Sequence, residues 1–453
     1  MRNGLCQRTM KMNRIINAYT RWSGITNPAQ RIKQTIAELF SDLLAKVFAR
    51  DRKARACGEQ RKETLPQWTI DSEGTLTVSG DFSYKDEEEY PWHSIRDTIK
   101  KIVLDDGVVA IGERAFIDCR YLASIDICNT IDSIGGFAFC GCYSLTSVIL
   151  PNSVRSIGKW AFNYCDRLQS INLPNSITFI GSDVFYGCKS LKSITLSNLL
   201  VDIPSHTFSE CKSLTSVIVP NSVSGIGDYA FSLCYALTSI VIPKNVTNIG
   251  RGAFVGCREL KSIIISDGVE TIGSAAFEGC INLTSITIPK SVKSIGEQAF
   301  VDCSKMIEIS VASDNGYYAS IDGVLFSKDL SVLVYCPDAK MGSYTIPSSV
   351  TCIAEQAFAN CNKLTSVFIP NSVDIIGFEA FLKCDSLTNV NIPNSVEYIE
   401  KGAFFGCTNA IIECDAETKP SNWDENWNEG SRTEDYDKWT IDKPYKGGMV
   451  VWK

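Results

Sequence analysis

Apolar residues recur along this chain with a period of 23 residues. Each repeat carries a phenylalanine and, three residues later, a cysteine. The twelve phenylalanines that keep this position are Phe116, Phe139, Phe162, Phe185, Phe208, Phe231, Phe254, Phe277, Phe300, Phe358, Phe381 and Phe404. One longer interval, between the ninth and the tenth of them, interrupts the period. A strict period of this length predicts a small supersecondary unit stacked many times, because one such unit cannot bury its apolar face alone.

Polar and apolar positions alternate within each repeat, and this alternation predicts short strands. In the repeat 157–179, Ile171 lies between Ser170 and Asn172, so one face of this segment is expected to be buried. Pro174 ends the strand because proline lacks the N–H group that a ladder needs. A second inward apolar pair follows, and the Ala-Phe-x-x-Cys segment predicts a short helical turn. The predicted fold class is an α/β repeat solenoid of 23-residue coils, built from short strands and short helical turns.

A glycine precedes most of the Ala-Phe segments. It occupies the same repeat position in Gly135, Gly158, Gly181, Gly227, Gly250, Gly273, Gly296 and Gly377. Two physical reasons can place a glycine here, a backbone conformation with positive φ or a close contact between neighbouring coils.

Departures from the period divide the chain into segments. We expect a basic N-terminal extension over residues 1–64, an N-terminal cap over 65–110, the solenoid over 111–411, and a Trp-rich acidic C-terminal cap over 412–453. Both caps are expected to be of β type, since strand patterns flank the repeats. An insertion at 312–343 carries Asp322-Gly323 between two strand-like runs, which predicts a β-hairpin.

Charge is distributed unevenly, and the N-terminal segment is basic. Residues 1–63 hold 14 Lys/Arg and 5 Asp/Glu, which leaves 30 Lys/Arg against 46 Asp/Glu in the other residues. After Asn27-Pro28, apolar residues follow an i, i+3/i+4 spacing as far as Phe48, which predicts an amphipathic helix. Four interpretations stay open. The helix packs on the solenoid or pairs with a partner, the segment extends upstream of a misassigned start, it lies on a membrane surface, or it is transit-like.

The composition excludes several classes of protein. The acidic repeats argue against nucleic-acid binding along the solenoid, because phosphate recognition needs clustered positive charge. No stretch approaches the roughly 20 apolar residues of a transmembrane helix, so membrane contact is expected only through the N-terminal helix. Twelve of the 19 cysteines occupy one repeat position. We interpret them as free, buried, small apolar residues, with a disulfide ladder between coils as the alternative.

Residues for catalysis are scarce. The chain has two histidines, His93 and His206, and neither belongs to a catalytic or zinc-binding spacing. The acidic segment 424–430 is similar to a calcium loop, but its glycine and its final acidic residue are out of place. We therefore expect no enzymatic activity, no cofactor and no metal site.

Two stripes of outward positions are candidates for protein binding. Two residues before each Phe, successive coils carry Phe137, Trp160, Asp183, His206 and Tyr229, which predicts an aromatic ridge. Ten residues after each Phe, adjacent coils carry Ile218, Val241 and Ile264, which predicts an exposed aliphatic patch on the sheet. The alternatives are that the rings pack over the neighbouring coil and that the aliphatic residues reflect ordinary β-propensity.

The repeat Ile-Gly-x-x-Ala-Phe-x-x-Cys-x-x-Leu-x-Ser-Ile-x-Ile-Pro-x-Ser-Val resembles the BspA-type leucine-rich repeat, found on surface and secreted proteins of anaerobic bacteria and some parasitic protists. The resemblance runs from about Trp68 to Trp452. It implies a right-handed leucine-rich-repeat superhelix, located at the cell surface or secreted, that adheres to host or microbial proteins.

Two functions follow from the residues and the resemblance together. We expect a non-enzymatic, adhesin-like protein that binds another protein through the solenoid surface. The alternative is an intracellular assembly scaffold that oligomerises through the N-terminal helix, because no secretory signal is seen at the start of the chain. No feature of the sequence identifies the protein ligand or the oligomeric state.

Overall fold

The structure is a computed structural model that describes residues 67–80, 90–429 and 447–453. By their contacts, the residues of the chain form two units, Met1–Thr64 and Leu65–Lys453. All described residues belong to the second unit. The expected N-terminal amphipathic helix lies outside the described residues.

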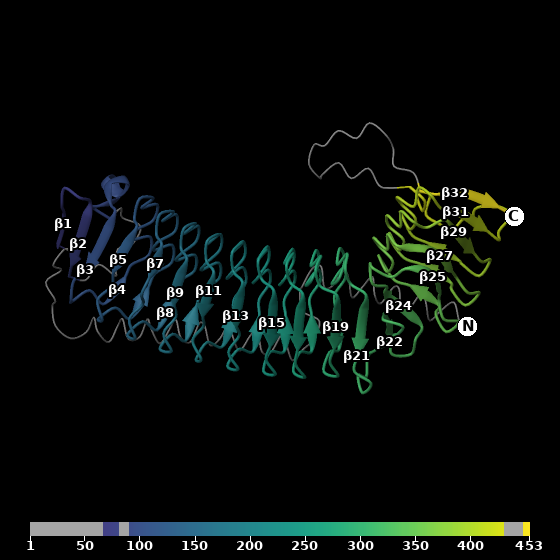
Figure 1. The fold of residues 1–453 in the computed structure, drawn as a ribbon, viewed down its shortest axis with the longest axis horizontal. Coiled ribbons are helices and arrows are strands. Elements are labelled where there is room, and N and C mark those ends of the chain that lie inside the picture. The colour runs from purple at the N-terminus through teal and green to yellow at the C-terminus, as the bar shows by residue number, and fades with distance from the viewer. Residues whose placement is uncertain (1–66, 81–89, 430–446) are drawn as a thin grey trace. The chain divides into compact units, whose positions relative to one another are not determined.

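The first strands of successive coils lie side by side, and parallel ladders join them into several hydrogen-bonded groups (Figure 1). Equal repeat positions pair, so Ser193 of one strand is opposite Ser170 on one side and Ser216 on the other. We call these strands the main sheet. They are β5 (Ser124–Asp126), β7 (Ser147–Val148), β9 (Ser170–Asn172), β11 (Ser193–Thr195), β13 (Ser216–Ile218), β15 (Ser239–Ile242), β17 (Ser262–Ile265), β19 (Ser285–Ile288), β21 (Glu308–Val311), β25 (Gly342–Thr345), β27 (Leu364–Phe368), β29 (Asn389–Ile392) and β31 (Ile411–Cys414).

The second strand of each coil is only two residues long and also stacks in parallel. Its second residue is apolar and points inward, as Ile157 and its partner Ile180 do. These strands are β4 (Ala110–Ile111), β6 (Ser133–Ile134), β8 (Ser156–Ile157), β10 (Phe179–Ile180), β12 (Asp202–Ile203), β14 (Gly225–Ile226), β16 (Asn248–Ile249), β18 (Thr271–Ile272), β20 (Ser294–Ile295), β26 (Cys352–Ile353), β28 (Ile375–Ile376) and β30 (Tyr398–Ile399).

Strands also lie at both ends of the solenoid. At the N-terminal end, β3 (Lys101–Leu104) and β2 (Thr75–Ser79) continue the main sheet, and β1 (Gln67–Ile70) adds an antiparallel edge. At the C-terminal end, β32 (Met449–Trp452) pairs in parallel with β31. Tryptophans cover the core at these ends, with Trp92 stacked on Phe116 and Trp427 edge-on to Phe404.

The core contains two columns of stacked phenylalanine rings, one from Phe116 to Phe300 and one from Phe358 to Phe404. Neighbouring rings stack with centroids 5.3 Å apart between Phe231 and Phe254 and 5.5 Å apart between Phe254 and Phe277. The rings are buried, and the cysteine of each coil lies buried beside them. Stacked rings at this separation contribute an attraction beyond the burial of their surface. The repeating Phe and Cys are therefore core residues, as the period predicts.

The Ala-Phe-x-x-Cys segments are turns, and the expected short helices do not form. The N–H of Phe254 donates to the carbonyl of Ala276 in the following coil at 2.8 Å, and Phe231 donates to Ala253 in the same way. An α-helical turn needs these N–H groups to bind the carbonyl four residues earlier. The only helix among the described residues is the 3-10 helix η1 (His93–Thr98). The expected α/β character was wrong, and the fold is a solenoid of strands and turns.

Close contact between coils explains the recurring glycine. A Cβ atom added to Gly158 would lie 2.4 Å from the backbone N of Gly136, and one added to Gly181 would lie 2.4 Å from the backbone N of Lys159. None of the eight glycines at this position has a positive φ. Of the two reasons given by the sequence, close approach is the one that applies.

Replacing Gly158 by alanine should lower the free energy of unfolding by about 2 kcal/mol, because the new methyl group meets backbone atoms that cannot move aside. Urea denaturation followed by circular dichroism measures this loss. The matched control is Gly316→Ala, where a Cβ atom would meet nothing within 4 Å. Equal stability of the two variants would show that glycine does not set the spacing of the coils.

The insertion lengthens one coil and interrupts both sheets. It contains the antiparallel hairpin β22 (Tyr318–Ile321) and β23 (Val324–Ser327), joined by Asp322-Gly323, and the strand β24 (Val332–Tyr335). Tyr335 lies 23 residues before Phe358 and takes the phenylalanine position, with its ring 5.7 Å from that of Phe300. The core accordingly divides into two clusters that meet at this junction.

Candidate protein-binding surface

The expected aromatic ridge is half-buried and divided into two pairs. Phe137 and Trp160 meet edge to face with ring centroids 4.8 Å apart, and His206 and Tyr229 stack at 5.0 Å. Asp183 occupies the coil between the two pairs. The structure thus brings neighbouring rings together but does not form one continuous aromatic surface.

Backbone geometry explains why these rings lie against the next coil. The φ angle is 62° at Trp160 and 56° at Phe137, His206 and Tyr229, so each residue is in the left-handed region. The Tyr229 ring covers Gly252 of the following coil, where an added Cβ atom would lie 2.4 Å from Tyr229 Cε1. Ring packing accounts for the aromatic residues at this position. A role for them in partner binding stays a prediction.

The aliphatic row of the main sheet is exposed to solvent. The side chains of Ile218, Val241 and Ile264 are 80%, 54% and 60% exposed on three consecutive coils. Val241 and Ile264 are direct partners in the ladder of β15 and β17. We call these three residues the aliphatic patch. The aromatic pairs lie twelve positions away in each 23-residue coil, about half a turn, so the two stripes do not form one site.

A row of serines borders the aliphatic patch. The outward position two residues before it in each strand is serine in eight consecutive coils, and all eight serines are exposed. They are Ser124, Ser147, Ser170, Ser193, Ser216, Ser239, Ser262 and Ser285. The patch therefore lies beside a regular row of short hydroxyl side chains.

Two further exposed apolar residues of the same row were not predicted from the sequence. Ile149 and Phe368 also lie ten residues after a repeat phenylalanine, and they are 79% and 57% exposed. Counting from Phe139 and Phe358 would have found them. Both are isolated from the aliphatic patch, since Asn172 and Thr195 separate Ile149 from Ile218.

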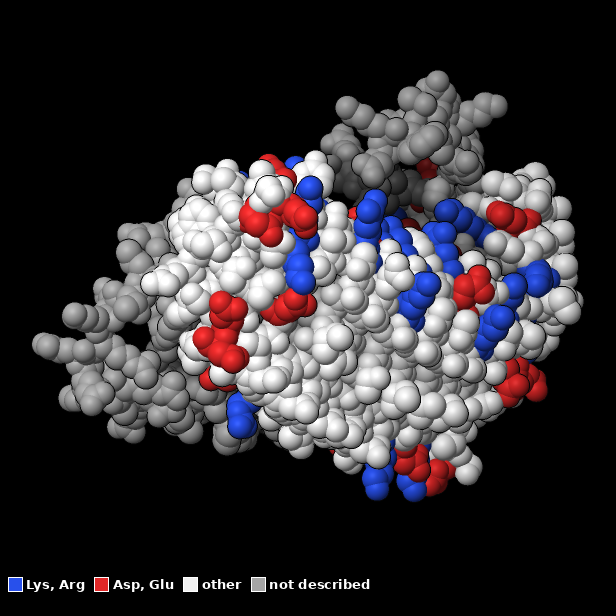
Figure 2. All heavy atoms as spheres, turned by 60° about the vertical axis from the view of Figure 1, so that its left-hand side comes forward, with Lys and Arg blue, Asp and Glu red and all other residues white. Residues whose placement is uncertain are grey.

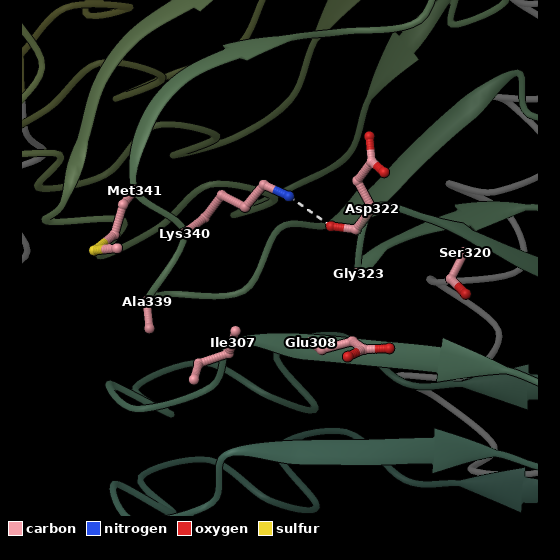
Figure 3. A pocket seen from close by; sticks show the side chains of 8 residues that line it. All are labelled: Ile307, Glu308, Ser320, Asp322, Gly323, Ala339, Lys340 and Met341. Atoms are coloured by element: carbon pink, nitrogen blue, oxygen red, sulfur yellow. Dashed lines mark hydrogen bonds between the residues drawn. The ribbon is translucent and has the colours of Figure 1, made fainter.

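A hollow of about 610 Å³ opens at the junction between the two parts of the solenoid (Figure 3). It is lined by Ile307, Glu308, Ser320, Asp322, Gly323, Ala339, Lys340 and Met341. The Lys340 ammonium donates a hydrogen bond to the backbone carbonyl of Asp322 across it. Ile307 and Met341 are 63% and 71% exposed and enlarge the apolar surface of this face. The Ser320 hydroxyl accepts a hydrogen bond from the Val311 N–H at 3.1 Å, and the Glu308 carboxylate accepts one from the Ser310 hydroxyl.

The cysteine column is a structural part of the core. In ten coils the repeat thiol donates to the carbonyl oxygen of the phenylalanine in the preceding coil, for example Cys257 to Phe231 at 3.1 Å and Cys280 to Phe254 at 3.3 Å. Cys361, which follows the insertion, donates to the carbonyl oxygens of Cys336 and Pro337 instead. Burial raises the pKa of Cys257 and Cys280 well above the usual range, which disfavours a reactive thiolate. The twelve repeat cysteines are free and buried, as interpreted from the sequence.

Neither histidine is placed for catalysis. His93 is buried, with its Nε2 atom 3.1 Å from the carbonyl oxygen of Arg114, and His206 is stacked on Tyr229. Over the described ranges, no group of three or more His, Cys, Asp or Glu side chains could hold a metal ion. In the same residues, no helix has the length and hydropathy to cross a membrane.

Parallel short strands, a column of core phenylalanines and a fixed 23-residue coil define the class of leucine-rich-repeat proteins. The model of the BspA type leucine rich repeat region matches six copies, over residues 94–215, 178–308 and 334–419. The chain belongs to this family. Membership suggests a role in protein interaction, and proteins with this architecture are typically not enzymes. A comparison with curated proteins finds no match.

The chain is also similar to several solved structures. A leucine-rich repeat protein from Bacteroides ovatus is 26% identical over 75% of this chain and 96% of that one, with a TM-score of 0.44. A leucine rich cell surface protein from Faecalibacterium prausnitzii is 23% identical over 81% and 96%, with a TM-score of 0.41. The pneumococcal vaccine antigen PcpA is 19% identical over 81% and 77%, with a TM-score of 0.39.

Proposed function

We propose that this chain is a non-enzymatic recognition protein that binds another protein through the main sheet, in the manner of a surface adhesin. The observation that carries the proposal is the aliphatic patch, because Ile218, Val241 and Ile264 are each more than half exposed on adjacent coils. Contiguous exposed apolar surface is a common mark of a protein-binding site, since its burial contributes roughly 25 cal/mol for each Å².

The scaffold supports this role. The patch belongs to strands that are fixed by parallel ladders on a buried core, so its side chains are presented in a constant geometry. A preorganised surface loses less conformational entropy on binding than a mobile loop does. Family membership points in the same direction.

Replacing Val241 by aspartate should weaken partner binding at least about 10-fold, because a buried, unpaired carboxylate would face the partner. The full chain is immobilised, partners are captured from extracellular-matrix and bacterial surface proteins, and each purified partner is titrated against wild type and variant. Phe179→Asp is the matched control, since Phe179 is 56% exposed on β10 of the other sheet.

Thermal unfolding of both variants should equal that of the wild type. Equal binding by wild type and Val241→Asp would exclude the main sheet as the binding surface. The adhesin role also requires that an antibody against the chain label intact cells. Retention inside the cell would instead favour the assembly scaffold.

A further inference from the structure

The loop that leads into each main-sheet strand is basic, although the repeats as a whole are acidic. This loop runs from the residue after the repeat cysteine to the residue before the serine of the strand. In the nine coils from Phe116 to Phe300 it holds eight Lys/Arg and two Asp/Glu, whereas residues 64–453 hold 30 against 46. We call its cations the basic rim. They are Arg120, Arg167, Lys189, Lys192, Lys212, Arg258, Lys261 and Lys305.

Several cations of the basic rim are available to a partner. Arg120, Arg167, Lys192 and Lys261 are exposed, and the described part of the chain offers none of them an ion pair. Lys189 pairs with Asp166 at 2.8 Å, and Lys212 pairs with Glu210 at 3.7 Å. The rim therefore carries uncompensated positive charge.

A tyrosine holds two further cations in place. Lys212 and Arg258 approach the ring of Tyr235 from the neighbouring coils, with distances to its centroid of 5.6 and 4.9 Å. Cation–π contacts restrict the two long side chains and orient their charges along the rim. Less side-chain entropy is then lost when a partner binds.

The basic rim adjoins the aliphatic patch. Lys212 lies in the loop that leads into the strand of Ile218. Lys261 lies in the corresponding loop before the strand of Ile264. Lys261 is three residues before Ile264, which corresponds to about 10 Å along a strand. An ordinary protein interface of about 800 Å² for each partner spans this separation.

Figure 2 shows Lys and Arg side chains over the upper and right-hand part of one face of the molecule, interspersed with Asp and Glu, beside a broad area with few charged groups.

We propose that the partner is a protein whose contact surface has an apolar centre and, on the side of the basic rim, a border of Asp and Glu. This rests on the proposed function of the main sheet and adds the chemistry of the partner. Opposite charge on the two surfaces accelerates encounter and sets the orientation of the complex. A nucleic acid or an acidic polysaccharide would use the rim but leave Ile218, Val241 and Ile264 exposed, so the patch favours a protein.

A defined probe tests the charge requirement on the full chain. A fluorescent peptide with an aliphatic centre and glutamate flanks is compared with a matched peptide that has lysine flanks, by fluorescence anisotropy. Heparin and polyglutamate serve as polyanions without an apolar centre. The rim variant is Lys192→Glu with Lys261→Glu, and the control is Lys401→Glu with Lys419→Glu, which changes the net charge equally near the C-terminal end.

We expect the glutamate-flanked peptide to bind about 10-fold more tightly than the lysine-flanked one. The rim variant should lose this preference, the control should keep it, and it should fade between about 50 and about 300 mM NaCl. Val241→Asp should weaken binding of the glutamate-flanked peptide as well. Circular dichroism of each variant confirms that it is folded.

The other outcomes overturn the inference. Equal binding of both peptides, unchanged in the rim variant but lost in Val241→Asp, would remove the charge requirement and leave the proposed function standing. Binding of heparin or polyglutamate as tight as that of the peptide, and unaffected by Val241→Asp, would make the rim a general polyanion site. If neither peptide binds, the partner chemistry proposed here is wrong, and the capture experiment alone decides the function.

Discussion

Phe254→Ala should lower the free energy of unfolding by about 3–5 kcal/mol, because it removes a fully buried ring and leaves a cavity in the core. Both neighbouring rings lose a stacking partner at the same time, since Phe254 contacts Phe231 and Phe277. Urea denaturation followed by far-UV circular dichroism measures the loss.

The control for this variant is Phe179→Ala. Phe179 is 56% exposed and lies outside the column, so its truncation should change stability by no more than about 0.5 kcal/mol. In a solenoid each coil contacts only its neighbours, so the cavity should also divide the unfolding transition at the mutated coil. A single transition with a loss below about 1 kcal/mol would show that the column contributes little to stability.

The second large effect concerns Asp338 at the junction. This residue is 3% exposed and lies three residues after Tyr335, where the regular coils carry a cysteine. The pKa of the Asp338 carboxyl is raised to about 7, mainly by burial; the hydrogen bond with Tyr335 opposes this rise and the nearby Asp302 carboxylate adds to it.

Hydrogen bonding supports a protonated Asp338. The Tyr335 hydroxyl lies within hydrogen-bonding distance of two acceptors, the Asp338 carboxyl and the carbonyl oxygen of Phe300 at 2.7 Å. A hydroxyl has one proton, so it satisfies both contacts only if Asp338 is the donor in one of them. Within the described residues, the other carboxyl oxygen of Asp338 is buried without a partner, which further disfavours the charged form.

Stability should therefore fall as pH rises from about 4 to about 7. The folded chain holds the Asp338 proton above the pH at which the unfolded chain releases it, so the stabilisation is complete below the usual carboxyl pKa of 3.8 and lost above the raised pKa of about 7. A shift of this size corresponds to roughly 4 kcal/mol as an upper figure.

Asp338→Asn isolates this contribution, because the amide donates to Tyr335 as a protonated carboxyl does but does not titrate. The difference in unfolding free energy between the variant and the wild type, measured by urea denaturation at pH 5 and pH 8, should grow toward pH 8. Asp267→Asn, at an exposed carboxylate, is the control. A constant difference would mean that Asp338 is ionised at both values.

The sequence predicts the architecture well because the same pattern of apolar positions recurs in every coil, so an irregular residue in one coil does not obscure it. The inward positions of Phe254 and Cys257 follow from the period and were confirmed. The predicted helical turn was wrong because the Ala-Phe-x-x-Cys segment was interpreted alone, without the neighbouring coil to which its N–H groups bind. In the structure, the Phe254 N–H binds Ala276 of another coil, and a local pattern does not show that partner.

Backbone conformation was the least predictable feature. The position two residues before each Phe requires a positive φ, and a glycine would be expected there, yet Trp160 and Tyr229 occupy it. Glycine occupies this position in two coils, as Gly252 and Gly402, whereas the recurring glycines lie at a different position, where the lack of a side chain matters. Ring stacking on the neighbouring coil stabilises a tryptophan in the left-handed region. This contact cannot be inferred from the sequence of one coil alone.

For the candidate surface, counting from each Phe located the aliphatic patch but not the basic rim. When charge is summed over residues 64–453 the net charge is negative, and this sum hides the local excess of cations to which Lys192 and Lys261 belong. Sorting the same charges by repeat position reveals the rim without a structure. The substitution of Tyr335 for a phenylalanine was missed for a different reason, because the insertion displaces it from the regular spacing.

The identical register of successive strands has a consequence for how this chain can change over generations. Ser193 meets Ser170 and Ser216 through the same pairing, so the loss or duplication of one 23-residue unit would join surfaces that already fit. Unequal recombination could therefore alter the length of the binding face in whole coils while preserving every ladder bond. The insertion at the junction occurs once among the described coils. The number of coils between it and the aliphatic patch would therefore show how many units have been gained or lost.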